Sequence, residues 1–565
     1  MAAPGTSLTS GPPMTALDGL LGGPLVDDLL LRAVRRAPDD VAVRSRDTAR
    51  TYAELNEEVT RFAAAVHESV EPGEVVALAS VLDPAFPLAF FGLCRAGAIP
   101  ALVNPLLREE ALAHVLATCA ATVAIIPPEL YPRLAAVRDR LPRLRSVLLT
   151  HRGHGTDPAA RALPTVADLV AAGSGTPPPT PATSHDIACL QFTSGTTGPA
   201  KVVRLSHHNL VVNAAQTAHA QRLTATSVVF NYLPTFHLMH LTISVTAGAS
   251  LVLWTGDDVA EAVEAADRFG ATHFYSLPVR LSRLAADERL PKLRARALRT
   301  VLCGGSALPL FATNALSQQF GVPVAQGYGL QETSPSTHFD DLDAPTLLSS
   351  GRPVAGTDCR IVRIGEGVDR EVLPVGEKGE IQVRGPQLML GYHDRDRARV
   401  VDAEGWFSTG DVGYVDSSGR LFVSDRIKDV FKCDNWLVSP TEIERVLRRH
   451  PQVADCAVFD FPDTFSGAVA YALVVPRRVG GGEPPDPAGF AAYIAERLPY
   501  YEHLRDVELI DAIPRSPTGK VQRRELRARA VARTSPKPDS ENRSASCSPS
   551  STGSPSPATP PNSNG

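Results

Sequence analysis

The chain has 565 residues, of which 44% are hydrophobic, 21% are charged and 6% are aromatic, and its formal net charge is −5. This apolar fraction excludes a wholly disordered or fibrous protein, and the length predicts several domains or one large domain with satellites. Because 56 basic residues nearly balance 61 acidic ones, neither a nucleic acid nor an anionic membrane surface is the expected partner.

The cysteines and the N-terminus indicate the compartment. The eight cysteines are scattered and form no CxxC pair, which argues against a disulfide framework or a zinc cluster and favours a reducing environment. The first basic residue is Arg32, so the N-terminus lacks the charged start of a secretory signal. The most apolar stretch, residues 75–103, is interrupted by charged residues and prolines and is not typical of a membrane span. We therefore expect a cytoplasmic protein with no membrane partner.

The first part of the chain alternates predicted helices and strands. Residues 1–15 are small and turn-rich and are expected to fray. Apolar spacing predicts helices over 25–38 and 51–70, the second opening with the Thr51–Glu54 capping box. Continuous apolar runs at 74–80 and 121–127 predict strands buried on both faces, with a helix over 88–98 between them. This alternation predicts parallel sheets covered by helices.

The rest of the chain predicts three further regions. A second alternating α/β series runs from about 210 to 350, and glycine turns and β-residues predict a β subdomain over 352–424. The predicted fold is therefore α/β, with a large N-terminal domain (16–424) of two mixed or parallel sheets packed with helices, and a small mobile C-terminal α+β domain (425–530). Residues 534–565 contain ten serines and seven prolines and predict a disordered tail.

A Gly/Ser/Thr loop with a lysine follows the strand that ends near residue 192. Glycines let the backbone approach an anion, amides and hydroxyls can wrap a phosphate, and a lysine adds positive charge. The Walker spacing is absent, and a flexible turn is the alternative interpretation. The residues predicted to hold phosphate are Thr193, Ser194, Gly195, Thr196, Thr197, Gly198 and Lys201.

Four more motifs follow in order: GYGLQE at 327–332, STGD at 408–411, DRIK at 425–428 and PTGK at 517–520. With the first loop, their order and spacing resemble the adenylate-forming superfamily of acyl-CoA synthetases, adenylation domains and beetle luciferases, over residues 25–530. The resemblance implies a reaction that joins a carboxylic acid to AMP, releases pyrophosphate and hands the acyl group to a thiol. It implies ATP, Mg²⁺ and coenzyme A as reactants and cofactors.

The resemblance also implies roles for single residues. Tyr328 would stack on adenine, and Asp411 would accept hydrogen bonds from the ribose hydroxyls. Glu332 would hold Mg²⁺, with Thr197 as a second ligand, and Lys520 would bridge the attacking carboxylate and the α-phosphate. Besides the phosphate loop, the implied nucleotide-binding residues are Gly305, Ser306, Ala307, Gln326, Gly327, Tyr328, Gly329, Gln331, Asp411 and Arg426.

Superfamily members rotate the C-terminal domain between two poses, and Asp425 matches the hinge. One pose would bring Lys520 into the site. The other would bring in the thiol tunnel, with Lys432, Asn435 and Trp436. His237 would gate the thiol, which makes Lys520, Glu332, His237 and Lys432 the implied catalytic residues, whereas His240 is interpreted as a pocket wall. The implied acyl pocket consists of Phe236, His237, Met239, His240, Tyr275, Gly304 and Gly305.

Four residues depart from the superfamily pattern: Val202, Gln331, Asn435 and His240. Because Val202 and Gln331 fall on the ATP side, one hypothesis is an enzyme that no longer adenylates but still makes a thioester from a supplied acyl-AMP. The leading hypothesis is an acyl-CoA ligase for an apolar or aromatic carboxylic acid. A third is an enzyme that loads a carrier protein in trans, and a silent adenylate sensor is the alternative outside catalysis.

Overall fold

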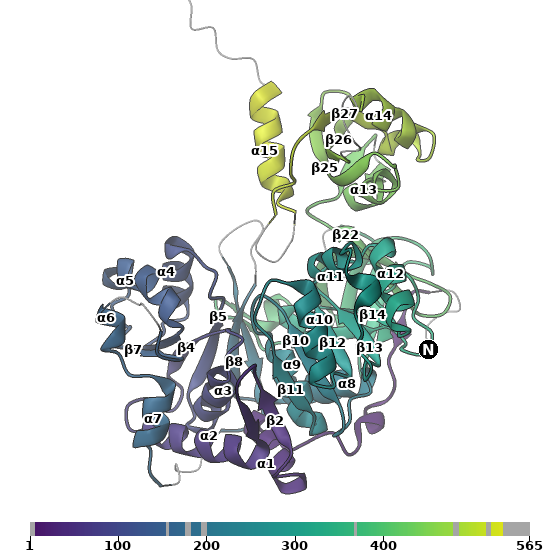
Figure 1. Cartoon of the computed structure of the whole chain (residues 1–565). Coiled ribbons are helices and arrows are strands. Elements are labelled where there is room, and N and C mark those ends of the chain that lie inside the picture. Colours follow the sequence, from purple (N-terminus) through teal and green to yellow (C-terminus); the bar gives the residue numbers. More distant parts are fainter. Residues whose placement is uncertain are drawn as a thin grey trace, which may run out of the picture.

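The computed structural model describes eight stretches of the chain, residues 6–153, 158–175, 182–193, 200–365, 370–434, 436–477, 485–515 and 521–534. They form a large body with three sheets and a small C-terminal unit, drawn at the top of Figure 1. Several predicted site residues lie outside these stretches: Ser194, Gly195, Thr196, Thr197, Gly198, Asn435 and Lys520. The predicted disordered tail also lies outside them, from residue 535 onward.

The first sheet has the strand order β20-β19-β9-β8-β5-β4-β6-β7, with β8 to β7 parallel and β9, β19 and β20 antiparallel. Its strands are β4 (Val75–Ala79), β5 (Ile99–Val103), β6 (Val123–Ile126), β7 (Ser146–Leu149), β8 (Ile187–Phe192), β9 (Val202–Ser206), β19 (Gly391–Tyr392) and β20 (Arg395–Asp396). Its helices are α2 (Tyr52–His67), α3 (Ala85–Arg95), α4 (Glu109–Thr118), α5 (Tyr131–Ala136), α6 (Pro158–Arg161) and α7 (Val166–Ala172). The predicted strands at 74–80 and 121–127 and the helix between them are confirmed as β4, β6 and α3.

The second sheet has the order β16-β15-β14-β13-β12-β10-β11-β2-β3 and is parallel from β14 to β2. Its strands are β2 (Val41–Arg44), β3 (Ala49–Thr51), β10 (Val228–Tyr232), β11 (Ser250–Leu253), β12 (His273–Ser276), β13 (Thr300–Cys303), β14 (Val324–Gly329), β15 (Ser336–Phe339) and β16 (Arg352–Pro353). The helices that accompany it are α1 (Val26–Arg36), α8 (His207–Ala220), α9 (Leu238–Ala247), α10 (Val259–Arg268), α11 (Pro278–Ala285) and α12 (Leu310–Phe320).

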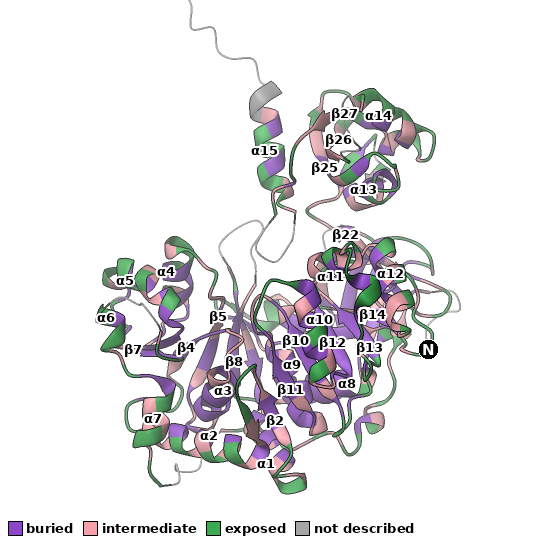
Figure 2. Ribbon diagram, in the orientation of Figure 1, coloured by how far each residue is buried: buried purple, intermediate pink, exposed green. Residues whose placement is uncertain are grey.

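Helices α8 and α9 belong to the core that joins these two sheets. One continuous hydrophobic cluster contains side chains of both sheets together with Leu210 of α8 and Leu241 of α9, and Figure 2 shows the strands of both sheets as buried. Helix α2 begins at the predicted capping box, in which the Thr51 hydroxyl accepts from the Glu54 amide at 3.2 Å. An ion pair between Arg95 of α3 and Asp27 of α1, at 2.9 Å, joins two of the covering helices.

The third sheet is small and antiparallel, in the order β1-β17-β18-β21-β22. Its strands are β1 (Thr9–Ser10), β17 (Asp358–Val362), β18 (Gly379–Arg384), β21 (Phe407–Val415) and β22 (Leu421–Arg426). The expectation that the N-terminus frays is wrong for residues 6–15, because β1 pairs with β17 and the Ser7 hydroxyl is buried against the Ile361 carbonyl. Small polar residues can be fixed by backbone pairing, which their composition does not reveal.

The C-terminal unit packs helices against a sheet of its own. It contains β23 (Phe431–Cys433), β24 (Trp436–Val438), α13 (Pro440–Leu447), β25 (Val453–Asp463), β26 (Gly467–Pro476), α14 (Pro487–Ala495), β27 (Leu504–Leu509) and α15 (Arg523–Thr534). Short 3₁₀ turns complete the described chain, at Met14–Leu17, Pro128–Leu130, Arg138–Arg140, Leu290–Lys292, Gln331–Thr333, Arg397–Arg399 and Tyr500–Glu502. The predicted α/β class, with a large N-terminal and a small C-terminal domain, is confirmed. None of the helices in the described stretches has the length and apolarity to span a membrane.

Candidate active site

A buried carboxylate, Asp411 of β21, is held by two partners, one from the second sheet and one from the strand next to β21. The Tyr328 hydroxyl of β14 donates to Oδ2 at 2.7 Å, and the Arg426 guanidinium of β22 lies 3.2 Å from Oδ1. Burial, and next the Asp411 carboxylate, raise the pKa of Tyr328, which keeps that hydroxyl a donor. Because an ionised carboxylate accepts hydrogen bonds at several positions, a carboxylate fixed in this way is chemically suited to bind hydroxyl groups of a ligand.

A second buried carboxylate, Glu332, follows β14 in the turn Gln331–Thr333. Its Oε1 accepts from the Tyr392 hydroxyl of β19 at 2.8 Å, and its backbone carbonyl accepts from the Met389 amide at 2.9 Å. The Lys201 ammonium lies 4.8 Å from the centroid of the Tyr392 ring, a cation–π contact. One tyrosine therefore connects the lysine of the phosphate loop to the carboxylate predicted to hold magnesium.

The chemistry of Glu332 fits a magnesium–nucleotide complex. Within the described stretches, no three His, Cys, Asp or Glu side chains gather into a metal site made by protein alone. Magnesium in nucleotide-dependent enzymes is usually bound by one or two carboxylates together with phosphate oxygens and water. A single buried carboxylate beside a lysine is such a donor set, and Mg²⁺ bound there would neutralise phosphate charge.

The two ends of the phosphate loop are joined by backbone pairing. The Thr193 amide donates to the Lys201 carbonyl at 3.0 Å, and the Lys201 amide donates to the Thr193 hydroxyl at 3.3 Å. Val202 begins β9 and is 2% exposed, packed among the side chains under the first sheet. The β-branched side chain of Val202 therefore packs into the core, and its effect on ATP handling stays a prediction.

The segment Gly304–Ala307 leaves the second sheet after β13, with Gly305 in the left-handed region at a φ of 87°. Gln326 fixes the far end of this loop, because its Oε1 accepts from the Leu308 amide at 2.9 Å. Gly329 lies so close to the next segment that an added Cβ would stand 1.9 Å from the Pro335 carbonyl. Gln331 places a buried Oε1 here that has no hydrogen-bond partner among the described residues.

The predicted acyl pocket begins at the N-terminus of α9. The ring centroids of Phe236 and Phe86 are 4.4 Å apart. The Phe236 amide donates to the carbonyl of Ser80, the residue directly after β4 of the first sheet. His237 caps α9, because its Nδ1 accepts from the Met239 amide at 3.3 Å. Burial lowers the pKa of His237 to about 4, so this ring is neutral at physiological pH and can act as an acceptor.

His240 and Tyr275, two further residues of the predicted acyl pocket, pack against each other. Their ring centroids are 4.5 Å apart, and the Tyr275 hydroxyl donates to Gln221. Burial, and next the neighbouring His237, lower the pKa of His240 well below its usual value. The structure thus brings the predicted residues Phe236, His237, Met239, His240 and Tyr275 together, and the interpretation of His240 as a pocket wall fits its burial.

Two residues of this region were missed from the sequence. Tyr392 stands in MLGYHDRD, and nothing in that local pattern marks it as a partner of Glu332. Asn231 of β10 is fully buried, and neither its Oδ1 nor its Nδ2 has a hydrogen-bond partner. A buried polar group left unpaired costs about 1–3 kcal/mol. The available signal for Asn231 was its polarity within the strand Val228–Tyr232, which is otherwise apolar apart from the tyrosine hydroxyl.

The predicted hinge residue connects the two parts of the chain. Asp425 is a buried residue near the end of β22. Its Oδ2 accepts hydrogen bonds from the Ser439 hydroxyl and the Thr441 amide at the start of α13, both at 3.0 Å. Lys378 of the large body pairs with Glu442 of α13 at 2.5 Å. The assignment of Asp425 as a hinge stays a prediction.

The predicted thiol-tunnel residues lie on the C-terminal unit. Lys432 is exposed on β23, and Trp436 is 54% exposed and stacks on Tyr501 at 5.1 Å. Among the described contacts, the structure does not bring either of them to Glu332 or Asp411. Their role in the thiol step therefore stays a prediction.

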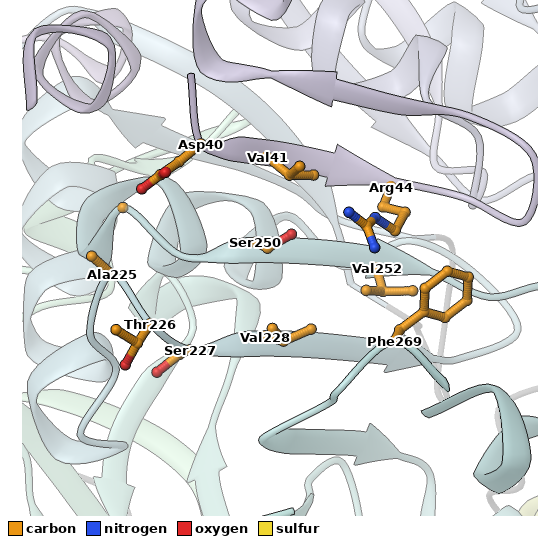
Figure 3. A pocket seen from close by; sticks show the side chains of 11 residues that line it. Asp40, Val41, Arg44, Ala225, Thr226, Ser227, Val228, Ser250, Val252 and Phe269 are labelled. Carbon is orange, nitrogen blue, oxygen red and sulfur yellow. The ribbon is translucent and has the colours of Figure 1, made fainter. Parts of the chain in front are cut away.

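A surface groove of about 400 Å³ lies elsewhere on the second sheet. Figure 3 shows it between β2, β11 and β10, with Arg44 beside the Phe269 ring. None of the predicted site residues lines it. Its lining consists of Asp40, Val41, Arg44, Ala225, Thr226, Ser227, Val228, Gly248, Ser250, Val252 and Phe269.

The two carboxylate clusters lie where the three sheets meet. Lys201 and Tyr392 come from the first sheet, Tyr328 and Glu332 from the end of the second, and Asp411 with its partner from the third. This arrangement, with a C-terminal α+β unit attached after Asp411, defines the class of adenylate-forming enzymes.

Comparisons with known proteins agree with that class. Residues 30–393 match the family model "AMP-binding enzyme", and residues 442–520 match "AMP-binding enzyme C-terminal domain". The chain is 32% identical to a feruloyl-CoA synthase of Amycolatopsis over 88% of this chain and 98% of the relative, and 31% identical to 4-coumarate–CoA ligase 5 of rice over 79% and 83%. It is also similar to a crystal structure of the anthranilate CoA ligase AuaEII with anthranoyl-AMP. The TM-score is 0.80 at 25% identity, and the match covers 90% of this chain and 98% of that one. The chain belongs to the AMP-binding enzyme family, within the adenylate-forming superfamily, and is an AMP-forming acid–thiol ligase.

Proposed function

We propose that this enzyme activates an apolar or aromatic carboxylic acid as its acyl-AMP and transfers the acyl group to coenzyme A. The observation that carries the proposal is the segment 328–332, whose Tyr328 is bonded to Asp411 and whose Glu332 is bonded to Tyr392 beside Lys201. The tyrosine bonded to the proposed ribose acceptor Asp411 and the carboxylate proposed to hold magnesium are therefore only four residues apart in the chain. The relatives' acids, ferulate, 4-coumarate and anthranilate, are aromatic and support this substrate class.

In this proposal, each charged group acts on the part of ATP that complements it. Asp411 binds the ribose hydroxyls, and Tyr328 lies beneath adenine. Lys201 and the loop from Thr193 bind the β- and γ-phosphates, and Glu332 holds Mg²⁺ against them. Lys520 stabilises the negative charge that develops as the carboxylate attacks the α-phosphate.

The acceptor thiol enters after the C-terminal unit rotates about Asp425. Rotation replaces Lys520 by Lys432, Asn435 and Trp436, so that one cleft performs two incompatible steps in turn. The exposed Lys432 and the exposed indole of Trp436 are available for such a change of partner. A carrier protein that brings a phosphopantetheine thiol in trans is the alternative acceptor.

A second candidate function rests on Gln331, whose buried Oε1 has no partner beside Glu332. If this amide displaces the nucleotide phosphates, the enzyme makes thioesters only from acyl-AMP supplied to it. Val202, the other departure on this side, has a buried side chain directly after Lys201.

The two half-reactions, assayed separately, test these functions. The full-length enzyme is incubated with a set of aromatic acids, ATP and Mg²⁺, and pyrophosphate release is measured. It is also incubated with synthetic acyl-AMP and either CoA or a holo-carrier protein, and thioester is measured. We expect both half-reactions with CoA. Thioester without pyrophosphate, restored by Gln331→Thr, would favour the second candidate, and neither product would overturn both.

A further inference from the structure

The acyl end of the site contains a buried amide that the proposed chemistry does not use. Asn231 is fully buried, and both ends of its side chain lack a partner. It stands in register with Leu253 on one side and Tyr275 on the other, in parallel strands. Residues in register on parallel strands point to the same face of the sheet, and Leu253 and Tyr275 face the core that contains α9. The Asn231 amide therefore lies on the acyl-pocket side.

A second unpaired polar atom belongs to a ring that packs against Tyr275. His240 of α9 is 4% exposed, its Nδ1 has no hydrogen-bond partner, and its ring packs 4.5 Å from the Tyr275 ring. Tyr275 is itself fixed, because its hydroxyl donates to Gln221. Tyr275 thus has one unpaired polar side chain in register with it on the neighbouring strand and another packed against its ring from α9.

We propose that Asn231 and His240 form a polar subsite that binds a hydroxyl group carried by the acid, remote from its carboxylate. The proposal rests on the proposed function, and it names two specificity-determining residues, one of them outside the pocket predicted from the sequence. A hydroxyl group both donates and accepts, and the Asn231 amide offers one acceptor and one donor to match it. The substrate hydroxyl then supplies the partner that the described protein groups do not supply.

The same residues disfavour charged substituents. Asn231 cannot ionise, and His240 stays neutral because burial lowers its pKa. The described pocket residues Phe236, His237, Met239 and Tyr275 carry no formal charge at neutral pH. A second carboxylate or an ammonium group on the acid would therefore be buried without a counter-ion, which is strongly unfavourable.

The test compares acids that differ by one hydroxyl group. We would measure kcat/KM for thioester formation with cinnamic and benzoic acids and their singly hydroxylated forms, in wild type, Asn231→Leu and His240→Phe. Thr246→Val is the matched control, because the Thr246 hydroxyl of α9 is also buried without a partner but lies almost two turns beyond His240. We expect wild type to prefer the best hydroxylated acid by about 100-fold or more, since unpaired site groups reject the analogue that lacks the hydroxyl. We expect Asn231→Leu and His240→Phe to reduce this preference at least tenfold and Thr246→Val to leave it unchanged.

A stability measurement separates this role from a structural one. Replacing an unpaired buried amide by an apolar side chain of similar size is neutral or stabilising, so we expect the Tm of free Asn231→Leu to equal or exceed that of wild type. A lower Tm with an unchanged hydroxyl preference would show a structural role or a bound water only, and would overturn the proposal. If a variant fails to fold, calorimetry on the wild type replaces it. Binding is then measured for pairs of acyl-AMP analogues with and without the hydroxyl group, and equal affinities would overturn the proposal. Absence of any acyl-AMP binding would instead overturn the proposed function.

Discussion

The nucleotide end and the acyl end of this active site differ in how their buried polar groups are paired. At the nucleotide end, the two carboxylates Asp411 and Glu332 already have hydrogen-bonding partners within the protein, although the Gln331 amide oxygen there has none among the described residues. At the acyl end, Asn231 and His240 keep polar atoms unpaired. The nucleotide is the same in every adenylate-forming reaction, so a network fixed in advance serves it well. The acid is particular to each enzyme, and unpaired groups can select it, at a cost in stability when no substrate is bound.

The largest effect is expected when the Glu332 charge at the nucleotide end is removed. We expect Glu332→Gln to lower kcat/KM for pyrophosphate release about 1,000-fold, or about 4 kcal/mol, because the amide no longer holds Mg²⁺ against the phosphates. Thioester formation from supplied acyl-AMP should change much less, since that step does not involve pyrophosphate. Equal losses in both half-reactions would contradict the assignment of Glu332 to the metal.

Asp411 tests the ribose contact. Asp411→Asn retains the shape of the side chain but loses the charge-assisted hydrogen bonds, which are about twice as strong as neutral ones. We expect AMP to bind about 100-fold more weakly by calorimetry. As a control, the affinity for inorganic pyrophosphate should be unchanged, because pyrophosphate has no ribose. An AMP affinity within twofold of wild type would contradict the role.

A Tyr392 variant tests whether the pairing of Glu332 matters, because Tyr392 contacts Glu332 from a strand distant in sequence. Tyr392→Phe removes the donated hydrogen bond but keeps the ring beneath Lys201. A hydrogen bond to a charged group contributes about 1.5–3 kcal/mol, so we expect kcat/KM for adenylation to fall about 20-fold. A positioning role also predicts a raised Mg²⁺ requirement, measured by titrating the metal at saturating ATP. An unchanged Mg²⁺ dependence would argue that Tyr392 only supports the fold.

The last prediction concerns the pH dependence of stability and leaves activity aside. Burial lowers the pKa of His237 and of His273 to about 4, whereas an unfolded histidine titrates near 6.5. Between these values the unfolded chain binds more protons, so the free energy of unfolding should fall as the pH drops from about 6.5 to 4, by up to about 1.4 kcal/mol per pH unit for each such histidine. Above pH 7 this contribution is constant. His273→Gln should flatten the pH dependence of Tm, whereas the exposed control His114→Gln should not.

Much of the fold could be predicted from local patterns. Continuous apolar runs identified β4 and β6, apolar spacing identified α1 and α2, and the Thr51–Glu54 box marked where α2 begins. These elements depend on side chains that are close together in the chain, so their pattern can be recognised without knowing which other elements they pack against. Residues 6–15 were misjudged because the pairing of β1 is with β17, more than 340 residues away.

The sequence by itself determined the chemistry of adenylate formation, because glycine-rich loops, Glu332 and Asp411 stand in ordered motifs that need no three-dimensional context to be seen. Only the tertiary structure decided what those groups contact: it joined Tyr392 to Glu332, moved Val202 into the core and left the Asn231 amide unpaired beside Tyr275. The physical reason is that hydrogen-bond pairing and burial depend on which strands lie side by side, and strand neighbours in these sheets are set by long-range packing.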